Sequence, residues 1–361
     1  MKLLIFNPEH EISLAYNKAN VTMPHNVRRF SRDLAFLPAL WAEDGDAIMV
    51  HDVKSARRKA KRWIGDRYKN ILFFTPGEVA LLQFDSVEPW GWDKTLCSQL
   101  INYGFDTYSV PDDVTLTRIR DMSNRLQTII LMNQLRDGIE KYTVGDPRFC
   151  TDQDELRVQA SMLHRFVMKA PWSSSGRGIR FAKYPLESPL TGWAKNIIAK
   201  QGGLIVEPFH DKVKDLALEF YSDGKGNVRY TGLSLFDTVD GAYSANIIAS
   251  ENTKRKMLAK YLDLELLDEV KERICKILGT ELQGIYAGPF GVDMMVVRGR
   301  KLNPCVEINL RMTMGHVANC IQVPDDVVES LRIMHYRNGF HISRRATTKY
   351  SLLKTRKDDK L

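Results

Sequence analysis

The first part of the chain alternates short apolar runs with amphipathic segments, which is typical of an α/β unit. Strands are predicted at residues 2–6, 47–51 and 70–74, and helices at 54–64 and 94–102. Strands that alternate with helices favour a mostly parallel sheet. We therefore expect a small α/β domain over residues 1–118.

The pattern changes after this point. Helical spacing of apolar residues marks 122–135 and 152–164, and a long amphipathic helix is predicted over 252–278. Strands are predicted at 166–169, 178–183, 203–207, 216–222, 227–234, 288–297 and 303–309. The turn Asp-Gly-Lys-Gly at 223–226 indicates antiparallel pairing. Residues 119–336 are thus expected to form an α+β domain.

Composition adds a soluble-protein profile and an uneven charge distribution. The chain has 361 residues and a formal net charge of +8, enough length for two or three subdomains. Residues 337–361 contain eight Lys or Arg and two Asp or Glu, so the rest of the chain is nearly neutral. Such a basic tail is more often a solvated end than a contact for RNA or acidic surfaces. Nucleic acid is therefore not an expected partner.

Targeting and redox signals are few. No apolar stretch approaches the ~20 residues that cross a bilayer, and the apolar start is too short for a signal peptide. The five cysteines are far apart and odd in number, which favours reduced thiols over disulfides or a metal site. We expect a cytoplasmic protein without a membrane partner.

A lysine and a Ser/Gly loop form the first chemical signal. Lys169 ends a predicted strand, and a small-residue loop follows after Ala-Pro-Trp: Ser173, Ser174, Ser175, Gly176, Arg177 and Gly178. Backbone N–H groups of small residues can wrap phosphate oxygens while the lysine supplies positive charge. The loop is not a Walker motif, because no Gly-Lys-Ser/Thr follows. Taken alone, the pattern is more often an ordinary turn.

A polar row on two apolar strands is the second, more specific signal. Glu307, Asn309 and Arg311 are two residues apart, so they share one face of a strand, and a hairpin with the preceding strand brings Asp293 to them. Two carboxylates and an amide oxygen suit Mg²⁺, and Arg311 can pair with a phosphoryl group. The alternative is a polar strand face with internal salt bridges.

Together with an apolar strand that ends in Glu207, Pro208 and Phe209, these signals resemble the ATP-grasp superfamily. The resemblance covers roughly residues 120–320, and the Glu-x-Asn-x-Arg-x4-His form, ending at His316, is similar to the biotin carboxylase branch. It implies an ATP-grasp fold, in which two α+β lobes grip ATP after a small parallel-sheet α/β domain. The lid lobe would span about 160–210 and the C-terminal lobe about 211–336.

The resemblance also implies roles for individual residues. Lys169 would contact the α/β-phosphates, the loop 173–178 would cover the β/γ-phosphates, and the backbone of 207–209 would bind adenine. Asp215 would bind the ribose, and Mg²⁺, or Mn²⁺, would be held by Asp293, Glu307 and Asn309. Arg125 stands where the family usually has a second nucleotide lysine, which puts the phosphate geometry in doubt.

The implied reaction is ATP-dependent carboxylate–amine ligation through an acyl phosphate, with Arg311, Lys169 and Mg²⁺ neutralising the developing charge. His316 is a candidate base or phosphate contact, although a lone histidine is more often only hydrogen-bonded in place. Candidate acceptor contacts are His10 and Glu11 after the first strand, and Tyr243 and Asn246 in a polar loop predicted over 237–246. Small-molecule or peptide carboxylates and amines are the expected partners, and a homodimer is an option. The alternatives are a phosphotransferase of the same fold and a non-catalytic nucleotide-binding module.

Overall fold

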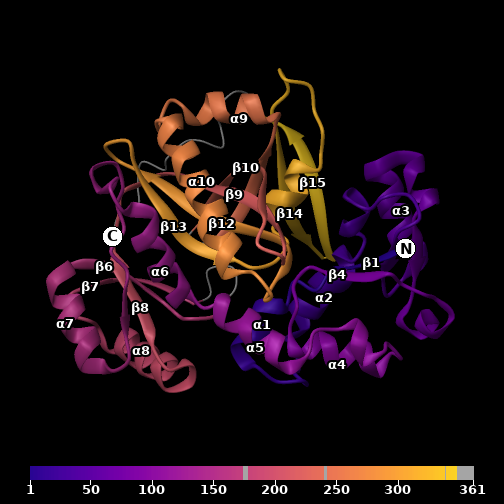
Figure 1. The fold of residues 1–361 in the computed structure, drawn as a ribbon, viewed down its shortest axis with the longest axis horizontal. Coiled ribbons are helices and arrows are strands. Elements are labelled where there is room, and N and C mark those ends of the chain that lie inside the picture. The colour runs from indigo at the N-terminus through magenta and orange to yellow at the C-terminus, as the bar shows by residue number, and fades with distance from the viewer. Residues whose placement is uncertain (174–177, 240–241, 338, 348–361) are drawn as a thin grey trace.

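The computed structural model describes residues 1–173, 178–239, 242–337 and 339–347, which form three sheets with helices around them (Figure 1). In the view of Figure 1 the N-terminal sheet lies on the right. The large orange and yellow sheet lies above, and the small lid sheet lies at the lower left. Along the chain the N-terminal sheet comes first, the lid sheet second and the large sheet last.

The N-terminal sheet is parallel, as predicted. Its strand order is β3-β2-β1-β4, from strands β1 (Lys2–Ile5), β2 (Ala47–Met49), β3 (Leu72–Phe74) and β4 (Ser86–Pro89). The helices of this part are α1 (His10–Tyr16), α2 (His25–Leu34), α3 (Val53–Ile64), α4 (Lys94–Asn102) and α5 (Asp113–Met122). Helix α1 follows β1 directly, so its residues start at the carboxyl edge of this sheet.

The lid sheet is antiparallel and has its own small core. It has the order β5-β8-β6-β7, from β5 (Arg148–Cys150), β6 (Arg165–Lys169), β7 (Ile179–Lys183) and β8 (Leu204–Pro208). Helices α7 (Gln153–Leu163) and α8 (Ser188–Gln201) cover one face. Met168 and Val206 point into this core, so Lys169 and Glu207 point to the opposite face.

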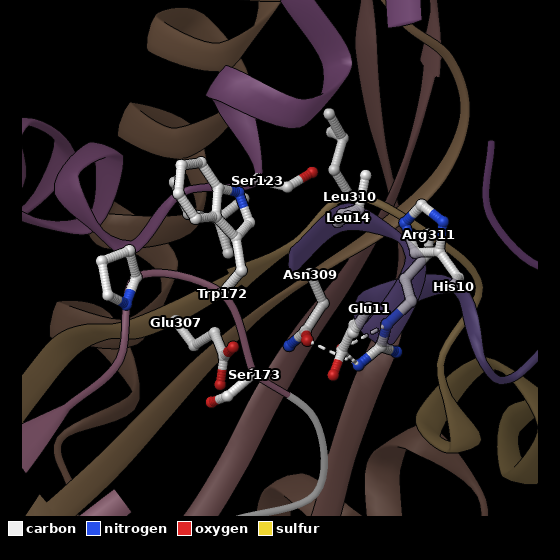
Figure 2. Close-up of a pocket in the computed structure, with 12 residues that line it drawn as sticks. His10, Glu11, Leu14, Ser123, Trp172, Ser173, Glu307, Asn309, Leu310 and Arg311 are labelled. Atoms are coloured by element: carbon white, nitrogen blue, oxygen red, sulfur yellow. Dashed lines mark hydrogen bonds and ion pairs between the residues drawn. The ribbon is translucent and has the colours of Figure 1, made fainter. Parts of the chain in front are cut away.

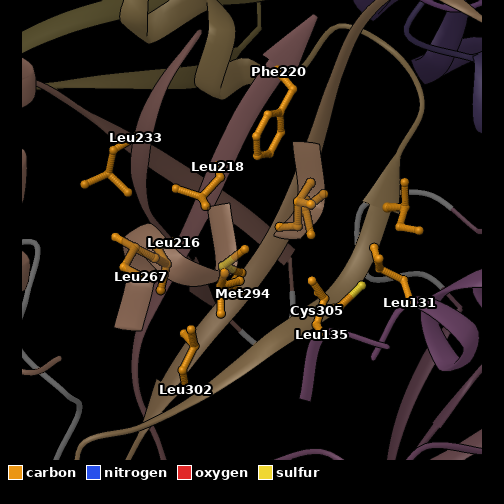
Figure 3. Close-up of a cluster of buried hydrophobic side chains, with 14 of the residues drawn as sticks. Leu131, Leu135, Leu216, Leu218, Phe220, Leu233, Leu267, Met294, Leu302 and Cys305 are labelled. Carbon is orange, nitrogen blue, oxygen red and sulfur yellow. The ribbon is translucent and has the colours of Figure 1, made fainter. Parts of the chain in front are cut away.

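The large sheet has seven strands in the order β13-β12-β9-β10-β11-β14-β15. The strands are β9 (Lys212–Asp223), β10 (Val228–Val239), β11 (Ala242–Ile248), β12 (Ala287–Val297), β13 (Lys301–Asn309), β14 (Glu329–Tyr336) and β15 (Gly339–Ala346). Helices α6 (Arg125–Arg136), α9 (Glu251–Leu258) and α10 (Leu264–Glu281) bury the largest core against one face, part of which is drawn in Figure 3. Helix α11 (Met314–Asn319) packs on β10 and β11.

Two predicted helices are wrong in their extent. The expected helix over 252–278 is two helices, because Asp263 accepts a hydrogen bond from the Glu265 N–H and so starts a new helix. The expected helix over 122–135 starts only at Arg125, because Asn124 caps it through the Leu126 N–H, and Met122 ends the helix before it. Capping side chains inside an unbroken apolar pattern account for both errors.

The polar loop and the basic tail are also corrected. The segment 237–246, taken as a loop, contributes the end of β10 and most of β11. Residues 339–346 were assigned to a solvated tail and instead form the edge strand β15, where the Phe340 N–H donates to Asp33 Oδ2 at 2.9 Å. The Phe340 ring packs against Phe30 of α2 at 5.1 Å between ring centroids. The remainder of the predicted tail, 348–361, lies outside the described residues.

Among the helices of the described ranges, none combines the length and the apolar composition that a bilayer crossing requires.

Candidate active site

Asp293, Glu307 and Asn309 form one polar row, here called the oxygen row, on the paired strands β12 and β13. Asp293 lies directly opposite Glu307, and Asn309 lies opposite Gly291. Val292 and Met294, which flank Asp293, point into the main core, so Asp293 points to the other face of the sheet. The structure therefore brings the three predicted metal-binding residues together.

Asp293 is a buried acid beside other acids. Burial raises the pKa of Asp293 well above its usual range, and the negative charges of Glu307 and Glu219 raise it further. Arg311 and a hydrogen bond with Asn309 oppose this shift. A cation at this position would relieve the crowding of carboxylates.

The oxygen row fits Mg²⁺ as a partial set of ligands. Nowhere in the described ranges do three or more His, Cys, Asp or Glu side chains form a group suited to a metal ion. Mg²⁺ commonly takes only one or two protein carboxylates and completes its shell with water and phosphate oxygens. Two carboxylates and one amide oxygen thus match a magnesium ion that binds together with a nucleotide.

Lys169 lies at the end of β6, next to Glu207 of β8. Its Nζ is 2.5 Å from Glu207 Oε1, and the two residues are only 4% and 6% exposed. The ammonium group is therefore neutralised by a carboxylate of the lid sheet. The two charges stabilise each other inside a site that would otherwise make each of them costly.

Arg125 connects the lid loop with the oxygen row. Its Nη1 donates to the Ala170 carbonyl at 2.7 Å and to Ser173 Oγ at 2.6 Å, and its Nη2 donates to Glu307 Oε1 at 2.5 Å. The side chain is buried at the first turn of α6. The arginine that replaces the expected lysine thus joins the two halves of the predicted nucleotide site.

The lysine of the lid sheet and the acids of the oxygen row both affect the pKa of the buried Cys305 thiol. Burial raises the pKa of Cys305, Asp293 and Glu307 raise it further, and the positive charge of Lys169 lowers it. The contacts of Arg125 with the carbonyl of Ala170, the residue after Lys169, and with Glu307 bring the end of β6 close to the oxygen row.

Arg311 pairs with a carboxylate of the N-terminal domain. Its Nε donates to Glu11 Oε1 at 2.7 Å, and Nη2 contacts the same oxygen. Nη2 also donates to Asn309 Oδ1 at 2.9 Å, and Nη1 donates to the Met312 carbonyl at 3.0 Å. Burial disfavours the charged guanidinium, but Glu11 and the nearby acids outweigh it and raise the pKa of Arg311.

A shallow pocket, whose empty space of about 310 Å³ includes open solvent, lies where helix α1, the lid loop and the end of β13 meet (Figure 2). Its lining combines the polar ends of the oxygen row with apolar side chains: His10, Glu11, Leu14, Ser123, Pro171, Trp172, Ser173, Glu307, Ile308, Asn309, Leu310 and Arg311. Figure 2 shows Glu11, Arg311 and Asn309 joined by dashed contacts on one side. Of the four predicted acceptor contacts, His10 and Glu11 line this pocket.

The other two acceptor candidates lie elsewhere. Asn246 of β11 is buried and donates to Ser234 Oγ at 2.7 Å, and Tyr243 lies on the same strand. Neither residue lines the pocket. Their assignment rested on a surface loop, which the structure replaces by paired strands.

His316 does not line the pocket. Its Nδ1 lies 3.0 Å from both Thr313 Oγ1 and Glu219 Oε2, and its Nε2 lies 3.1 Å from the Phe220 carbonyl. Both ring nitrogens thus face protein groups. The geometry gives no support to the expected base or phosphate contact.

Of the remaining predicted nucleotide contacts, the structure describes some and leaves others outside the described residues. Asp215 pairs with Lys212 Nζ at 2.6 Å and accepts from Thr238 Oγ1 at 2.9 Å, away from the pocket. The Phe209 N–H donates to the Arg165 carbonyl, so it is not open to adenine. The Gly178 position is tight, since a Cβ there would lie 2.3 Å from the side chain of Ser173. Ser174, Ser175, Gly176 and Arg177 lie outside the described residues.

Sequence reasoning missed the group around Trp172. The Arg120 guanidinium lies 3.6 Å from the centre of the Trp172 ring, and Trp172 Nε1 donates to the Arg120 carbonyl at 3.0 Å. Arg120 Nε in turn donates to the Leu14 carbonyl of α1 at 2.7 Å. No local pattern predicts these contacts, because they join segments that are about 50 and 100 residues apart.

Comparison with known proteins supports the fold. No protein-family model matches the chain, and no curated protein sequence matches it. Among solved structures, the biotin carboxylase of Campylobacter jejuni in complex with β,γ-ATP matches at a TM-score of 0.54 and 12% identity, covering 92% of this chain and 75% of that one. The biotin carboxylase domain of Hydrogenobacter thermophilus 2-oxoglutarate carboxylase, a dimer with MgADP, ADP and bicarbonate, matches at a TM-score of 0.55 and 13% identity, covering 92% and 74%.

These neighbours are ATP-grasp proteins, and this chain has the ATP-grasp fold. The fold prediction, with a small parallel α/β sheet ahead of the antiparallel sheets, is confirmed.

Proposed function

We propose that this chain is an ATP-dependent ligase that binds MgATP between the lid sheet and the large sheet. It activates a substrate carboxylate as an acyl phosphate, which an amine or similar nucleophile then attacks. The observation that supports the proposal is Arg125, which joins the lid at Ala170 and Ser173 to Glu307 of the oxygen row. Cationic side chains of the lid and helix α6 beside paired acids suit a metal-bound polyphosphate chain.

In the first step a carboxylate oxygen of the substrate attacks the γ-phosphorus, and ADP leaves. In the second step the amine nitrogen attacks the acyl carbon, loses a proton, and inorganic phosphate leaves. Lys169 is paired with Glu207, and Arg125 with Glu307. Both cations would bind phosphate oxygens once these carboxylates share or release the cations. The chain thus contributes positioning and charge neutralisation rather than a covalent nucleophile.

Asp293, Glu307 and Asn309 would hold the magnesium ion. When bound, the ion neutralises phosphate charge and fixes the orientation of the phosphate groups. The neighbouring carboxylates are ionised more easily beside a cation, because it offsets the repulsion that raises the pKa of Asp293.

A coupled assay tests the proposal. Purified protein with MgATP is supplied with pools of carboxylates, with and without amines, and with hydroxylamine as a trap for acyl phosphates. Hydroxamate formation together with ADP release is the expected result. Failure to hydrolyse ATP or to form hydroxamate with any carboxylate pool would contradict the ligase assignment.

The same assay separates the phosphotransferase alternative. A kinase leaves a stable phosphorylated product and releases no inorganic phosphate, whereas the ligase releases phosphate when both carboxylate and amine are present. The position of the pocket favours the ligase, because Glu307 and Asn309 share it with Arg311, a side chain suited to a carboxylate.

A further inference from the structure

The Glu11–Arg311 pair gives the pocket an acidic and a basic group side by side. Both side chains are partly buried, with exposed fractions of 14% and 19%, and both line the pocket. Glu11 comes from α1 of the N-terminal domain, and Arg311 follows β13 of the large sheet, 300 residues later. Figure 2 shows the two side chains reaching toward each other across the pocket wall.

This pair sets an electrostatic condition on any substrate. A simple carboxylate that binds Arg311 must separate it from Glu11, and it then leaves two neighbouring carboxylates to share one guanidinium. In a partly buried site such an uncompensated charge is costly. A molecule that carries an ammonium group beside its carboxylate avoids the cost, because it supplies a new partner to each member of the pair.

The spacing of the two groups adds a second condition. Arg311 Nε and Glu11 Oε1 are 2.7 Å apart, so the substrate charges must also be close to each other. In an α-amino acid the ammonium and carboxylate groups flank the same carbon atom. In a γ-amino acid they are separated by three carbon atoms, and they fit two adjacent protein charges less well.

The rest of the lining indicates what kind of side chain follows. Leu14, Leu310, Pro171 and Trp172 supply apolar surface to the pocket. Trp172 is held in its orientation by Arg120, through stacking and a hydrogen bond that the indole nitrogen donates to the Arg120 carbonyl. A fixed aromatic wall and two leucines suit a small or medium apolar side chain.

We propose that the carboxylate donor of this enzyme is a free α-amino acid with an apolar side chain, whose carboxylate binds Arg311 and whose ammonium binds Glu11. The inference rests on the proposed function, because it places the substrate carboxylate beside Glu307 and Asn309 of the oxygen row. Glu11 is then a specificity-determining residue that selects zwitterions over simple acids.

Calorimetric titration of the full chain, saturated with Mg²⁺ and a non-hydrolysable ATP analogue, tests this assignment on unmodified protein. The probes are L-alanine and L-leucine, each compared with the acid that lacks the amine (propanoate, 4-methylpentanoate) and the amine that lacks the acid (ethylamine, 3-methylbutylamine). 4-Aminobutanoate tests the spacing of the charges. At least one amino acid is expected to bind at least tenfold more tightly than its acid, its amine and 4-aminobutanoate.

A variant reverses the preference. In Glu11→Gln the ammonium loses its partner while Arg311 is freed, so binding of the amino acid weakens about tenfold and binding of the matching acid strengthens. An acid that binds wild-type protein as tightly as its amino acid, or amino-acid binding unchanged in Glu11→Gln, overturns the inference.

The nucleotide separates this inference from the proposed function. If the protein binds the Mg²⁺-nucleotide but neither amino acid, the substrate assignment fails and the ligase proposal stands. If the nucleotide itself does not bind, the proposed function fails first.

Discussion

The oxygen row and the cations that face it are assembled in different ways. Asp293, Glu307 and Asn309 lie on two consecutive strands of one hairpin, backed by the largest apolar core of the molecule. Lys169 and Arg125 come from the lid sheet and from helix α6, and each ends in an ion pair with an acid far away in sequence. The acids are therefore fixed by the register of one hairpin, and Lys169 is fixed against Glu207 by the register of the lid sheet, whereas Arg125 depends on how the lobes meet.

This difference has a functional consequence. Each cation of the site is already neutralised: Lys169 by Glu207 and Arg125 by Glu307. Under the proposed function, incoming phosphates would exchange partners with existing ion pairs rather than bind to isolated charges. Variants on the two sides should accordingly differ, with loss of chemistry on the rigid side and combined loss of binding and stability on the lid side.

Glu307→Ala should give the largest effect. Removal of one ligand of the oxygen row should lower ATP-dependent phosphate release by roughly 10²–10³-fold, as for loss of one strong electrostatic contact to a transition state. Circular dichroism should show a retained fold, with a lower unfolding free energy because the buried Arg125 loses its partner. Lys301→Ala, at an exposed position of the same strand, is the matched control and should keep wild-type release. Equal rates for Glu307→Ala and wild type would contradict the role of this row.

Lys169→Met tests the lid side. It should weaken binding of the ATP analogue at least tenfold and destabilise the protein by about 3 kcal/mol, because Glu207 is left buried without its partner. The double variant Lys169→Met/Glu207→Leu removes the unpaired carboxylate. Urea unfolding should therefore show that stability is regained, while the affinity for the ATP analogue stays low. Wild-type affinity in the double variant would show that the lysine does not contact the nucleotide.

Glu9→Gln probes, through pH, the residue before helix α1, which carries the pocket residues His10 and Glu11. Burial, reinforced by the charge of Asp93, raises the pKa of Glu9 from 4.5 to about 7. Between pH 4.5 and about pH 7, Glu9 loses its proton in the unfolded chain and keeps it in the folded chain. The free energy of unfolding therefore falls as the pH rises through this range, by about 3 kcal/mol in all.

The glutamine variant lacks this loss. Its stability relative to wild type, from urea unfolding at pH 4.5 and pH 8, should therefore increase toward the higher pH. The exposed Glu265→Gln serves as control and should show no such trend. A Glu9→Gln difference that stays constant with pH would contradict the raised pKa.

Arg125→Lys should have a smaller effect. A lysine keeps the charge but cannot bond Ala170, Ser173 and Glu307 with the fixed geometry of a guanidinium. Phosphate release should fall about tenfold, worth about 1.4 kcal/mol. Full activity in Arg125→Lys would mean that the bridge between the lobes contributes only charge.

Trp172→Phe should give the smallest change. It removes the hydrogen bond from the indole nitrogen to the Arg120 carbonyl and should cost about 1 kcal/mol of unfolding free energy. Most of the stacking on Arg120 remains. A loss of several kcal/mol would show that this contact supports more of the interface between lid and N-terminal domain than one hydrogen bond.

Sequence reasoning found those parts of the site that local periodicity encodes. The two-residue spacing of Glu307 and Asn309 and the hairpin that brings Asp293 to them need only strand geometry. The partners of Arg125, Arg311 and Trp172 could not be predicted, because they lie 45 to 300 residues away and depend on the packing of lobes. For His316 the structure favours the alternative of a histidine hydrogen-bonded in place, since both ring nitrogens lie near protein groups.

Fold prediction shows the same division. Alternating strands and helices were sufficient for the parallel N-terminal sheet. The edge strand β15 was missed because its arginines and histidine read as a solvated tail, although Phe340 and Ile342 pack in the core beneath it. Alternation of apolar and polar residues with only two apolar members is a weak indication of a strand until the neighbouring strand is known.

The most direct test of the central claim measures a divalent cation at the oxygen row. Binding of Mn²⁺, followed by the EPR signal of the free ion, is compared with and without a non-hydrolysable ATP analogue in wild type and in Asp293→Asn/Glu307→Gln. We predict that the complex of wild-type protein and ATP analogue binds Mn²⁺ more tightly than the free analogue does. The double variant should lose at least tenfold in Mn²⁺ affinity while keeping its fold. Identical Mn²⁺ binding by the two proteins would contradict a metal–nucleotide site between these strands and Lys169.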